Sequence, residues 1–528
     1  MAGPGEGDSG GRPRPDSEDR TEALMQYADP VDPWATAEAA AVANDGHVPS
    51  HLADPQSPAQ PNSTWTIPGA PGSETVPQPA PTRKRVLTAY RKGLLISAAA
   101  GAVALGVTAA VLLWPDFPAL DFHSLDEESR YQPVGSISSL WSDAEVVGER
   151  AVFASVGDNG ALGVVAVDTG SRKELWRTTI TEPGVTGWDS MVATPGEVVL
   201  YSTLNASSKI TMVVLDLEDG GKKLWDRPLG SSDTVQLGTE NALVLDKGEG
   251  RLLWVDLQSG KVAHEEDDTD SSVIVPVTTP ADLTGPTSTL GRGLNAQLTD
   301  NRVIQINGNN SVRVLDLKTG KTLKDRDSVA STSSDVLAHD GRLFVEDTTG
   351  TADRIFAYSL DELGEPVTLY TAPENATLGT FTPCGTRLCF VETDGYDRAK
   401  DRVVAVDAAK GGKAWEKPVA EVDALTPVGD SLLVTTSADT DQVTLLDSGG
   451  ATEWTATGRA ARLDGANILR FADPLTSSLG NRSLSGVHLG DNPVPMDEVR
   501  DVYTGSCSWN TTVLACVGKE QFLLYRFS

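Results

Sequence analysis

Positive charge is scarce in this chain of 528 residues. It has 43 Lys and Arg against 74 Asp and Glu, which gives a formal net charge of −31. The summed field would repel a polyanion, so the balance argues against a nucleic-acid partner and against docking of the folded part on anionic lipid. Aromatic residues are also few, at 6%, whereas the 50 glycines suit many short strands joined by tight turns.

Cysteine and histidine are sparse as well. Four cysteines form two sequence-local pairs, an even count that fits disulfides in an oxidising compartment, with four buried free thiols as the alternative. Only four of the six histidines follow residue 114, and they show no metal-ligand spacing. The chain also lacks a nucleophile elbow or a supported nucleotide-binding glycine loop. We therefore predict no catalytic residue, no cofactor and no metal.

The N-terminal 92 residues differ in composition from the rest. Residues 1–82 hold 14 of the 31 prolines and a net charge of −9. Such a segment buries too little apolar surface to offset its ordering entropy. Residues 83–92 then carry five basic and no acidic side chains. We predict a disordered, acidic, proline-rich tail over residues 1–92 that ends in a basic cluster.

Residues 93–114 form a stretch of 22 residues without any charge. As a helix it would span about 33 Å, enough for a bilayer core of about 30 Å. The basic cluster before it places the N-terminus in the cytoplasm and the C-terminal part outside. A cleaved signal peptide is the alternative, but the stretch begins late and exceeds a usual signal core. We predict an uncleaved single-pass signal anchor in the cell membrane, followed by a linker over residues 115–134.

A short phrase recurs from about residue 135 to the C-terminus: an apolar strand, a polar turn, a second apolar strand ending in Asp, a Gly turn and often Trp. Clear copies begin at residues 164, 212, 252, 312, 403 and 443, weaker ones at 355 and 483, and a truncated one at 522. The spacing is mostly 40–50 residues, which is typical of propeller blades. We predict an all-β fold with a β-propeller over residues 135–528, with eight blades favoured and seven as the alternative.

The turn chemistry of the phrase is specific. The Asp carboxylate can accept backbone N–H groups of the turn, and Gly supplies a left-handed conformation. A Trp about eight residues later can pack between neighbouring blades and bury about 150–250 Å². Four tryptophans stand at this place: Trp176, Trp225, Trp415 and Trp454. We interpret them as structural docking residues rather than ligand contacts.

One copy carries the full pattern Ala-x-Asp-x-x-x-Gly-x-x-x-Trp, at Ala405, Asp407, Gly411 and Trp415. This pattern resembles the tryptophan-docking motif of PQQ-like β-propellers in the bacterial envelope, and the resemblance covers residues 135–528. It implies the fold but no single function, because this fold family includes quinoprotein dehydrogenases, outer-membrane assembly factors and sensor ectodomains. The dehydrogenases are marked by adjacent cysteines and a calcium site, and this chain has no adjacent cysteines.

The cysteines fit the register of the repeat. Each pair flanks a turn that leads into the first strand of a phrase, so each bond would join two adjacent antiparallel strands of one blade. We therefore predict the disulfides Cys384–Cys389 and Cys507–Cys516. The truncated last copy lacks its outer strand, and the segment after Tyr131 is expected to supply it and close the ring.

The longest departure from the repeat runs from His264 to Asp300. It begins with the acidic run 265–270, which lacks the spacing of a calcium loop and is interpreted as a solvated surface loop. We hypothesise that the insertion is a recognition loop, with a tolerated mobile excursion as an equal alternative. On either view, deleting about 266–290 is expected to leave the melting curve nearly unchanged.

Three functions compete. The favoured one is a non-enzymatic, membrane-tethered binding or scaffold module of the bacterial cell envelope, whose partner is an unidentified protein or envelope ligand. The alternatives are a sensor ectodomain that relays to a cytoplasmic partner and a quinoprotein-like enzyme that uses the centre of the propeller. The ligand, the oligomeric state and the role of the tail are not predicted by the sequence.

Overall fold

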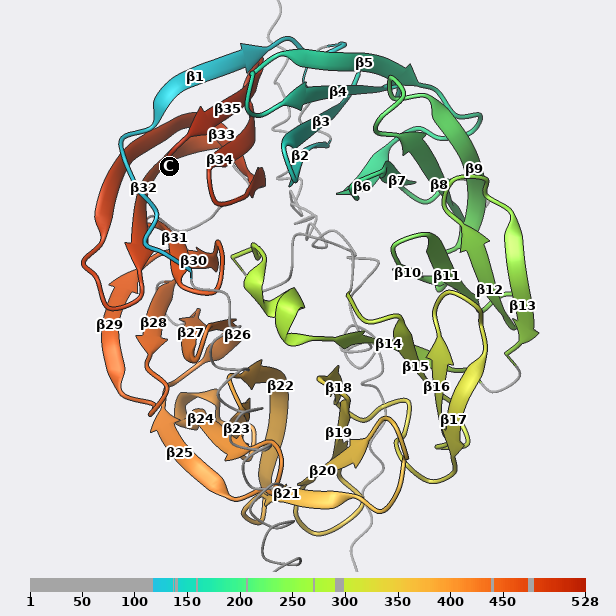
Figure 1. Cartoon of the computed structure of the whole chain (residues 1–528), viewed down its shortest axis with the longest axis vertical. Helices are drawn as coiled ribbons and strands as arrows, with labels where there is room; N and C mark the ends of the chain where they lie inside the picture. Colours follow the sequence, from blue (N-terminus) through green and yellow to red (C-terminus); the bar gives the residue numbers. More distant parts are fainter. Residues whose placement is uncertain are drawn as a thin grey trace, which may run out of the picture.

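The structure is a computed structural model that describes residues 117–528, except 136, 138–140, 158–159, 206–207, 269–270, 290–298, 438–440 and 473–478. The predicted tail over 1–92 and the predicted span over 93–114 lie outside the described residues. Within the described part, the chain forms an all-β ring of small sheets, a β-propeller (Figure 1). No helix in that part is long and apolar enough to cross a membrane.

Five sheets have four strands each, which run from the centre of the ring outwards in chain order (Figure 1). The first is β2 (Ser142–Val147), β3 (Arg150–Val156), β4 (Leu162–Asp168) and β5 (Glu174–Ile180). The second is β6 (Trp188–Ala193), β7 (Glu197–Ser202), β8 (Lys209–Asp216) and β9 (Lys223–Gly230). The third is β10 (Thr234–Leu237), β11 (Asn241–Asp246), β12 (Arg251–Asp256) and β13 (Val262–Asp267).

The other two four-stranded sheets lie further along the chain. One is β22 (Ala376–Cys384), β23 (Arg387–Asp394), β24 (Arg402–Asp407) and β25 (Lys413–Pro418), with the short 3-10 helix η3 (Arg398–Lys400) between β23 and β24. The other is β26 (Val422–Val428), β27 (Ser431–Thr436), β28 (Gln442–Leu446) and β29 (Thr452–Thr457). Every neighbouring pair in these sheets is antiparallel.

An eight-stranded sheet consists of two such units joined at their innermost strands. The first half is β14 (Val273–Thr278), β15 (Arg302–Ile306), β16 (Val312–Asp316) and β17 (Thr322–Arg326). The second half is β18 (Val336–His339), β19 (Arg342–Asp347), β20 (Arg354–Ser359) and β21 (Val367–Thr371). The junction is a short parallel pair in which Val277 faces Ala338 and Thr278 faces His339.

A seven-stranded sheet closes the ring, in the order β1, β35, β34, β33, β32, β31, β30. Its strands are β1 (Asp126–Tyr131), β30 (Arg459–Arg462), β31 (Asn467–Phe471), β32 (Leu479–His488), β33 (Val494–Trp509), β34 (Val513–Gly518) and β35 (Phe522–Arg526). The 16-residue strand β33 pairs with β32 through its first part and with β34 through its last part. Because β33 can be counted with either half, the number of blades stays a prediction.

Strand β1 corrects two expectations about the N-terminal side of the domain. It pairs antiparallel with β35, with Tyr131 opposite Phe522, and so supplies the outer strand of the last copy. The closing strand thus ends at Tyr131 instead of starting after it. Residues 115–134 are also not simply a linker, because from Phe117 onward this segment contacts the sheet of β30–β33.

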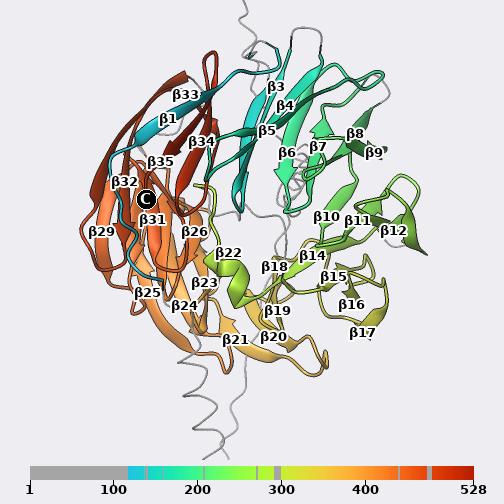
Figure 2. The same cartoon turned by 45° about the horizontal axis from the view of Figure 1, so that its top comes forward.

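The hydrophobic core is divided among the interfaces between neighbouring sheets, which lie side by side around the ring (Figure 2). Central strands are apolar on both faces because each face meets another sheet, and β7 is buried at all six positions. At the closing interface, Phe153 of β3 stacks on Phe522 of β35 with ring centroids 5.0 Å apart. Adjacent sheets therefore stabilise each other, and the ring depends on being closed.

Candidate interaction site at the centre of the ring

The insertion after β13 does not form the loop that the sequence predicted. Glu265, Glu266 and Asp267 lie on the outer strand β13, and Asp268 is buried, where its carboxylate accepts hydrogen bonds from Gln305 and the backbone of Ser272. The acidic run 265–270 is therefore not a solvated loop in its described part. The chain then forms the innermost strand β14, in which Ile274, Val275 and Val277 are buried.

Residues 279–289, which we call the strap, leave the end of β14 and cross the inside of the ring (Figure 1). The strap starts with a short 3-10 helix, η2 (Pro280–Thr284). The sequence Thr279-Pro280-Ala281-Asp282 favours this turn, because Pro suits the first helical position and the Asp282 carboxylate accepts the backbone N–H of Thr279 at 2.6 Å. The same carboxylate accepts the backbone N–H of Thr299 at 2.9 Å, so it joins both ends of the insertion.

Arg462, at the end of innermost strand β30, anchors the strap on the far side of the ring. Its guanidinium donates to the carbonyl oxygens of Gly285 at 2.7 Å and Pro427 at 2.8 Å. Arg462 is only 2% exposed, and this burial lowers the pKa of its guanidinium to about 10. The group still carries its charge at neutral pH, so its hydrogen bonds to the strap are charge-assisted.

Thr287 fixes the tip of the strap to the same strand. Its backbone N–H donates to the carbonyl of Arg462 at 2.9 Å, and its hydroxyl accepts the Arg462 backbone N–H at 3.0 Å. Its carbonyl accepts the indole N–H of Trp509 at 3.0 Å. Thr287 is 1% exposed. The tip of the strap is thus packed into the fold, whereas Pro280 and Ala281 in its 3-10 helix are exposed.

Further titratable groups lie on or beside the innermost strands. Burial raises the pKa of Asp143 on β2 to about 7 and, with the nearby Asp143 charge, raises the pKa of Glu145. Burial lowers the pKa of His339, whose Nδ1 lies 2.9 Å from the Thr278 hydroxyl. In the described residues, no group of three or more His, Cys, Asp or Glu side chains is arranged to hold a metal ion. These groups can exchange protons, but among the described residues they do not form a recognisable catalytic set.

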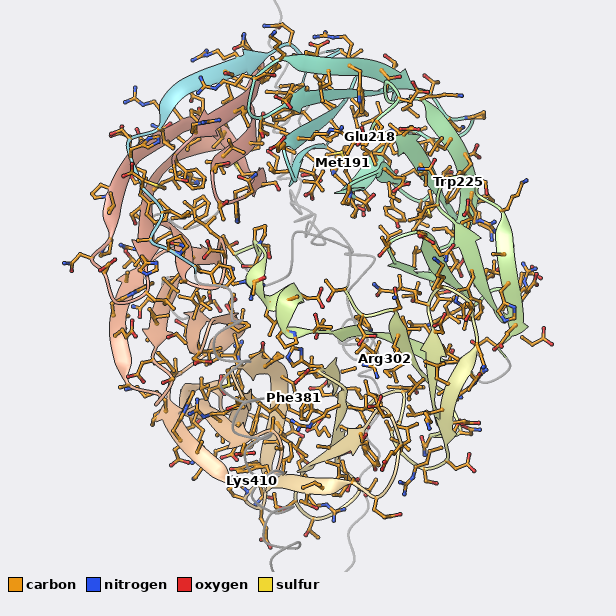
Figure 3. The ribbon with its side chains drawn as sticks, viewed as in Figure 1. Met191, Glu218, Trp225, Arg302, Phe381 and Lys410 are labelled. Atoms are coloured by element: carbon orange, nitrogen blue, oxygen red, sulfur yellow. A yellow bond between two sulfur atoms is a disulfide. The ribbon has the colours of Figure 1, made fainter. Side chains whose placement is uncertain are left out.

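The strap lies at one end of the ring, which we call the strap face. At this face the turns 148–149, 340–341, 429–430 and 463–466 connect innermost to second strands, and neighbouring turns touch, as when Asn510 donates to the carbonyl of Gly148. The opposite face carries the turns 247–250 and 395–401 between second and third strands. In Figure 3, Met191 and Phe381 lie towards the centre, whereas Trp225 and Lys410 lie towards the rim.

The predicted tryptophans lie at the interfaces between sheets and not at the centre. The Trp176 indole donates to the carbonyl of Leu217 in the next sheet at 2.9 Å, and its ring fills the space above Gly221, where a methyl group would overlap it. Trp225 and Trp415 repeat the arrangement, donating to Leu257 at 2.6 Å and to Ser448 at 3.0 Å.

The copies of this arrangement differ in detail. Trp176 is buried, whereas Trp225, Trp415 and Trp454 are half-buried. The indole N–H of Trp454 has no acceptor among the described residues. His264 takes the same place in its copy and lies above Gly320. The turn aspartates act as the sequence predicts, since Asp407 accepts the backbone N–H groups of Ala409 at 2.9 Å and Lys410 at 3.1 Å.

Both disulfides have the pairing that the sequence predicts. Cys384–Cys389 joins β22 to β23, and Cys507–Cys516 joins β33 to β34. The described part holds no free cysteine. Neither bond belongs to the strap or its contacts.

The sequence did not predict the residues that hold the strap, above all Arg462. The Thr-Pro-x-Asp start of the 3-10 helix was the one readable signal.

One family model and several solved structures are similar to this chain. Residues 121–266 match the family model described as outer membrane protein assembly factor BamB. The crystal structure of BamB from Moraxella catarrhalis aligns with 76% of this chain and 100% of that chain, at 14% identity and a TM-score of 0.38. No curated protein matches the chain.

Two other solved structures are similar over comparable parts of this chain. A eukaryotic initiation factor aligns with 73% of this chain and 90% of that chain, at 12% identity and a TM-score of 0.45. A structure from a study of two prolyl endopeptidases aligns with 70% of this chain and 50% of that chain, at 13% identity and a TM-score of 0.37. The family match and the sheet order together support a BamB-like β-propeller domain with PQQ-type repeats.

Proposed function

We propose that this chain is a non-enzymatic, membrane-tethered β-propeller that binds a protein or envelope ligand in the bacterial cell envelope. The observation that carries the proposal is the strap. A segment of the chain itself lies inside the ring, where Arg462 and Trp509 hold it by hydrogen bonds to its backbone. With this place taken by the strap, we infer that recognition uses the turns of the ring rather than a central cofactor site.

The proposed tether rests on the sequence. The uncharged stretch 93–114 follows five basic residues at 83–92, a combination that favours an anchor with a cytoplasmic N-terminus. The match of residues 121–266 to a family of outer-membrane assembly factors supports a role in the envelope.

Site-specific photo-cross-linking in intact cells tests the binding role. A photoreactive residue at Tyr396, which is 96% exposed on the opposite face, should give a discrete adduct with an envelope component. A photoreactive residue at Lys173, an exposed position beside the outer strand β5, serves as the matched control and should not give the same adduct.

A purified outer domain, residues 117–528, tests the enzymatic alternative. It should not reduce an artificial electron acceptor when PQQ and calcium are added. Acceptor reduction that depends on both additions would overturn the non-enzymatic proposal.

Protease added to intact cells should cleave residues beyond 115 and spare an N-terminal tag. An accessible tag would overturn the proposed orientation of the tether.

A further inference from the structure

The chain enters the propeller close to the centre of the strap face. Phe117, the first described residue, lies directly over Gly465, where a methyl group would overlap its ring. Gly465 belongs to the turn between innermost strand β30 and second strand β31. The same turn touches its neighbour at Gly429, which approaches the carbonyl of Gly465. The entry point is therefore on the inner part of this face and not on the outer rim.

From there the chain is fixed across the end of the sheet. Asn467 donates its side-chain amide to the carbonyl of Pro118 at 3.0 Å and accepts the backbone N–H of Leu120 at 3.2 Å. Phe122 covers Gly486, and the backbone N–H of Leu125 donates to Met496 at 3.1 Å. The segment then turns into β1 at the rim, as the blue trace beside β30 and β32 shows (Figure 1). These contacts fix the segment that follows Phe117 to the ring.

The distance to the proposed membrane span is short. Three Cα–Cα steps separate Trp114, the last residue of the uncharged stretch, from Phe117, which allows at most about 11 Å. The polar layer of a bilayer is about 5–8 Å thick on each side. Phe117 therefore lies within a few ångströms of the lipid headgroups if residues 93–114 span the membrane.

We propose that the strap face lies against the lipid surface and that the opposite face points away from it. This proposal rests on the proposed tether. A tether of this length at the rim would let the ring stand on edge. At the inner part of a face it brings the whole face towards the bilayer, because tilting the ring would press one side of its rim into the headgroups. The strap is then covered by the membrane, and the turns 247–250 and 395–401 are presented to partners.

Charge does not produce this orientation. The short turns that connect innermost to second strands on the strap face carry five carboxylates and no basic side chain; they are Glu149, Glu240, Asp340, Asp430 and Asp464. The turns between third and fourth strands lie further out on the same face and also carry basic side chains, among them Lys173, Lys261 and Lys410. The inner part of the face is thus acidic and its outer part carries charges of both signs, so charge gives the face as a whole no attraction to anionic lipid. The covalent tether therefore sets the orientation, and the acidic turns keep the face beside the headgroups without inserting into them.

Two variants of the full chain, each with one added cysteine, test the orientation. D430C places a thiol on the strap face and Y396C places one on the opposite face of the neighbouring sheet, and both positions are exposed. All four native cysteines are in disulfides, so each variant has one free thiol for a fluorophore. The protein is reconstituted in phosphatidylcholine vesicles whose headgroups carry a short-range quencher. Strand β27 has six residues, so the two faces lie about 20 Å apart.

We expect quenching to be at least about twofold stronger for D430C than for Y396C, because the difference in height exceeds the reach of the quencher. A flexible Gly/Ser spacer of about 30 residues inserted between Asp116 and Phe117 should abolish the difference, since it lengthens the tether well beyond the height of a sheet. Equal quenching without the spacer, or stronger quenching for Y396C, would overturn the orientation while leaving the tether intact. A chain that does not float with the vesicles would overturn the tether itself and the orientation with it.

Discussion

Glu346 is a buried carboxyl group whose titration should be visible in the stability of the domain. Burial, together with the charges of Asp335 and Asp353, raises its pKa from 4.5 to about 8. The folded chain therefore holds this proton more tightly than the unfolded chain. The free energy of unfolding should fall as pH rises from about 4.5 to about 8, and the stabilisation is fully present only below that window.

The variant E346Q isolates this contribution. Its glutamine stays neutral, so between pH 5 and pH 8 its free energy of unfolding should fall less than that of the wild type, by about 2–4 kcal/mol. Urea denaturation of residues 117–528 at several pH values measures the difference. E362Q, at an exposed position in the same sheet, should follow the wild-type curve. Parallel curves for E346Q and the wild type would contradict the assignment.

The docking tryptophans should differ in their contributions to stability. Trp176 is buried and hydrogen-bonded, so W176A should lower the free energy of unfolding by about 3–5 kcal/mol. Trp415 is half-buried, and W415A should cost about 2 kcal/mol because less of its ring leaves water. Chemical denaturation of residues 117–528 compares them. Equal losses would show that the exposed part of Trp415 does not matter.

At this scale the repeat made much of the structure predictable. The Asp, Gly and Trp positions follow from local spacing that several copies of the phrase share, and both disulfides follow from the place of the cysteines in that phrase. Arg462 was not predictable in this way. Its partners Gly285 and Pro427 are 177 and 35 residues away in the chain, and no local pattern records such a contact.

Among the elements, the strap differs most from expectation. Deleting about 266–290 was expected to leave melting nearly unchanged, but that range contains part of β13, all of β14 and the strap. Its removal would expose the core of the eight-stranded sheet. The mistake has a physical cause: Asp, Thr and Pro are typical of loops, yet here they occupy an outer strand and a 3-10 turn, because an outer strand needs apolar residues on one face at most.

The anchoring of the strap can be tested at Arg462. R462M leaves the carbonyls of Gly285 and Pro427 without this donor and should lower the free energy of unfolding by about 2–4 kcal/mol. It should also make residues 279–289 more sensitive to limited proteolysis under native conditions. R500M, at an exposed arginine, should change stability by less than about 0.5 kcal/mol. Unchanged stability and unchanged cleavage of the strap would show that Arg462 does not hold it.

For the whole molecule, the ring should depend on its N-terminal segment. A chain that starts at Phe117 keeps β1 and the aromatic contact between Phe122 and Phe527, whose ring centroids are 6.3 Å apart. A chain that starts at Gly135, the boundary that the sequence predicts, loses both and leaves the edge of β35 unpaired. The second chain should be less stable by at least about 3 kcal/mol, because several apolar side chains lose their cover.

Thermal unfolding and sedimentation of the two chains measure this difference. The chain that starts at Gly135 should also associate through its exposed strand edge. Similar melting temperatures for the two chains would show that the domain begins near Gly135, as the sequence predicts. The propeller class was predictable because the phrase repeats every 40–50 residues, whereas the blade count was not, because the long strand β33 serves both halves of one sheet.

The pairing of β1 with β35 also has a consequence for how this protein is made. Asp126 faces Arg526, so the contact that seals the ring joins residues from opposite ends of the described chain. During synthesis, β1 emerges early and has no partner until nearly the whole chain has followed. Contacts of such long sequence separation form slowly, and unpaired edges invite association in the meantime. The maturing protein therefore passes through a period with both edges open, and this period ends only when the last strand arrives.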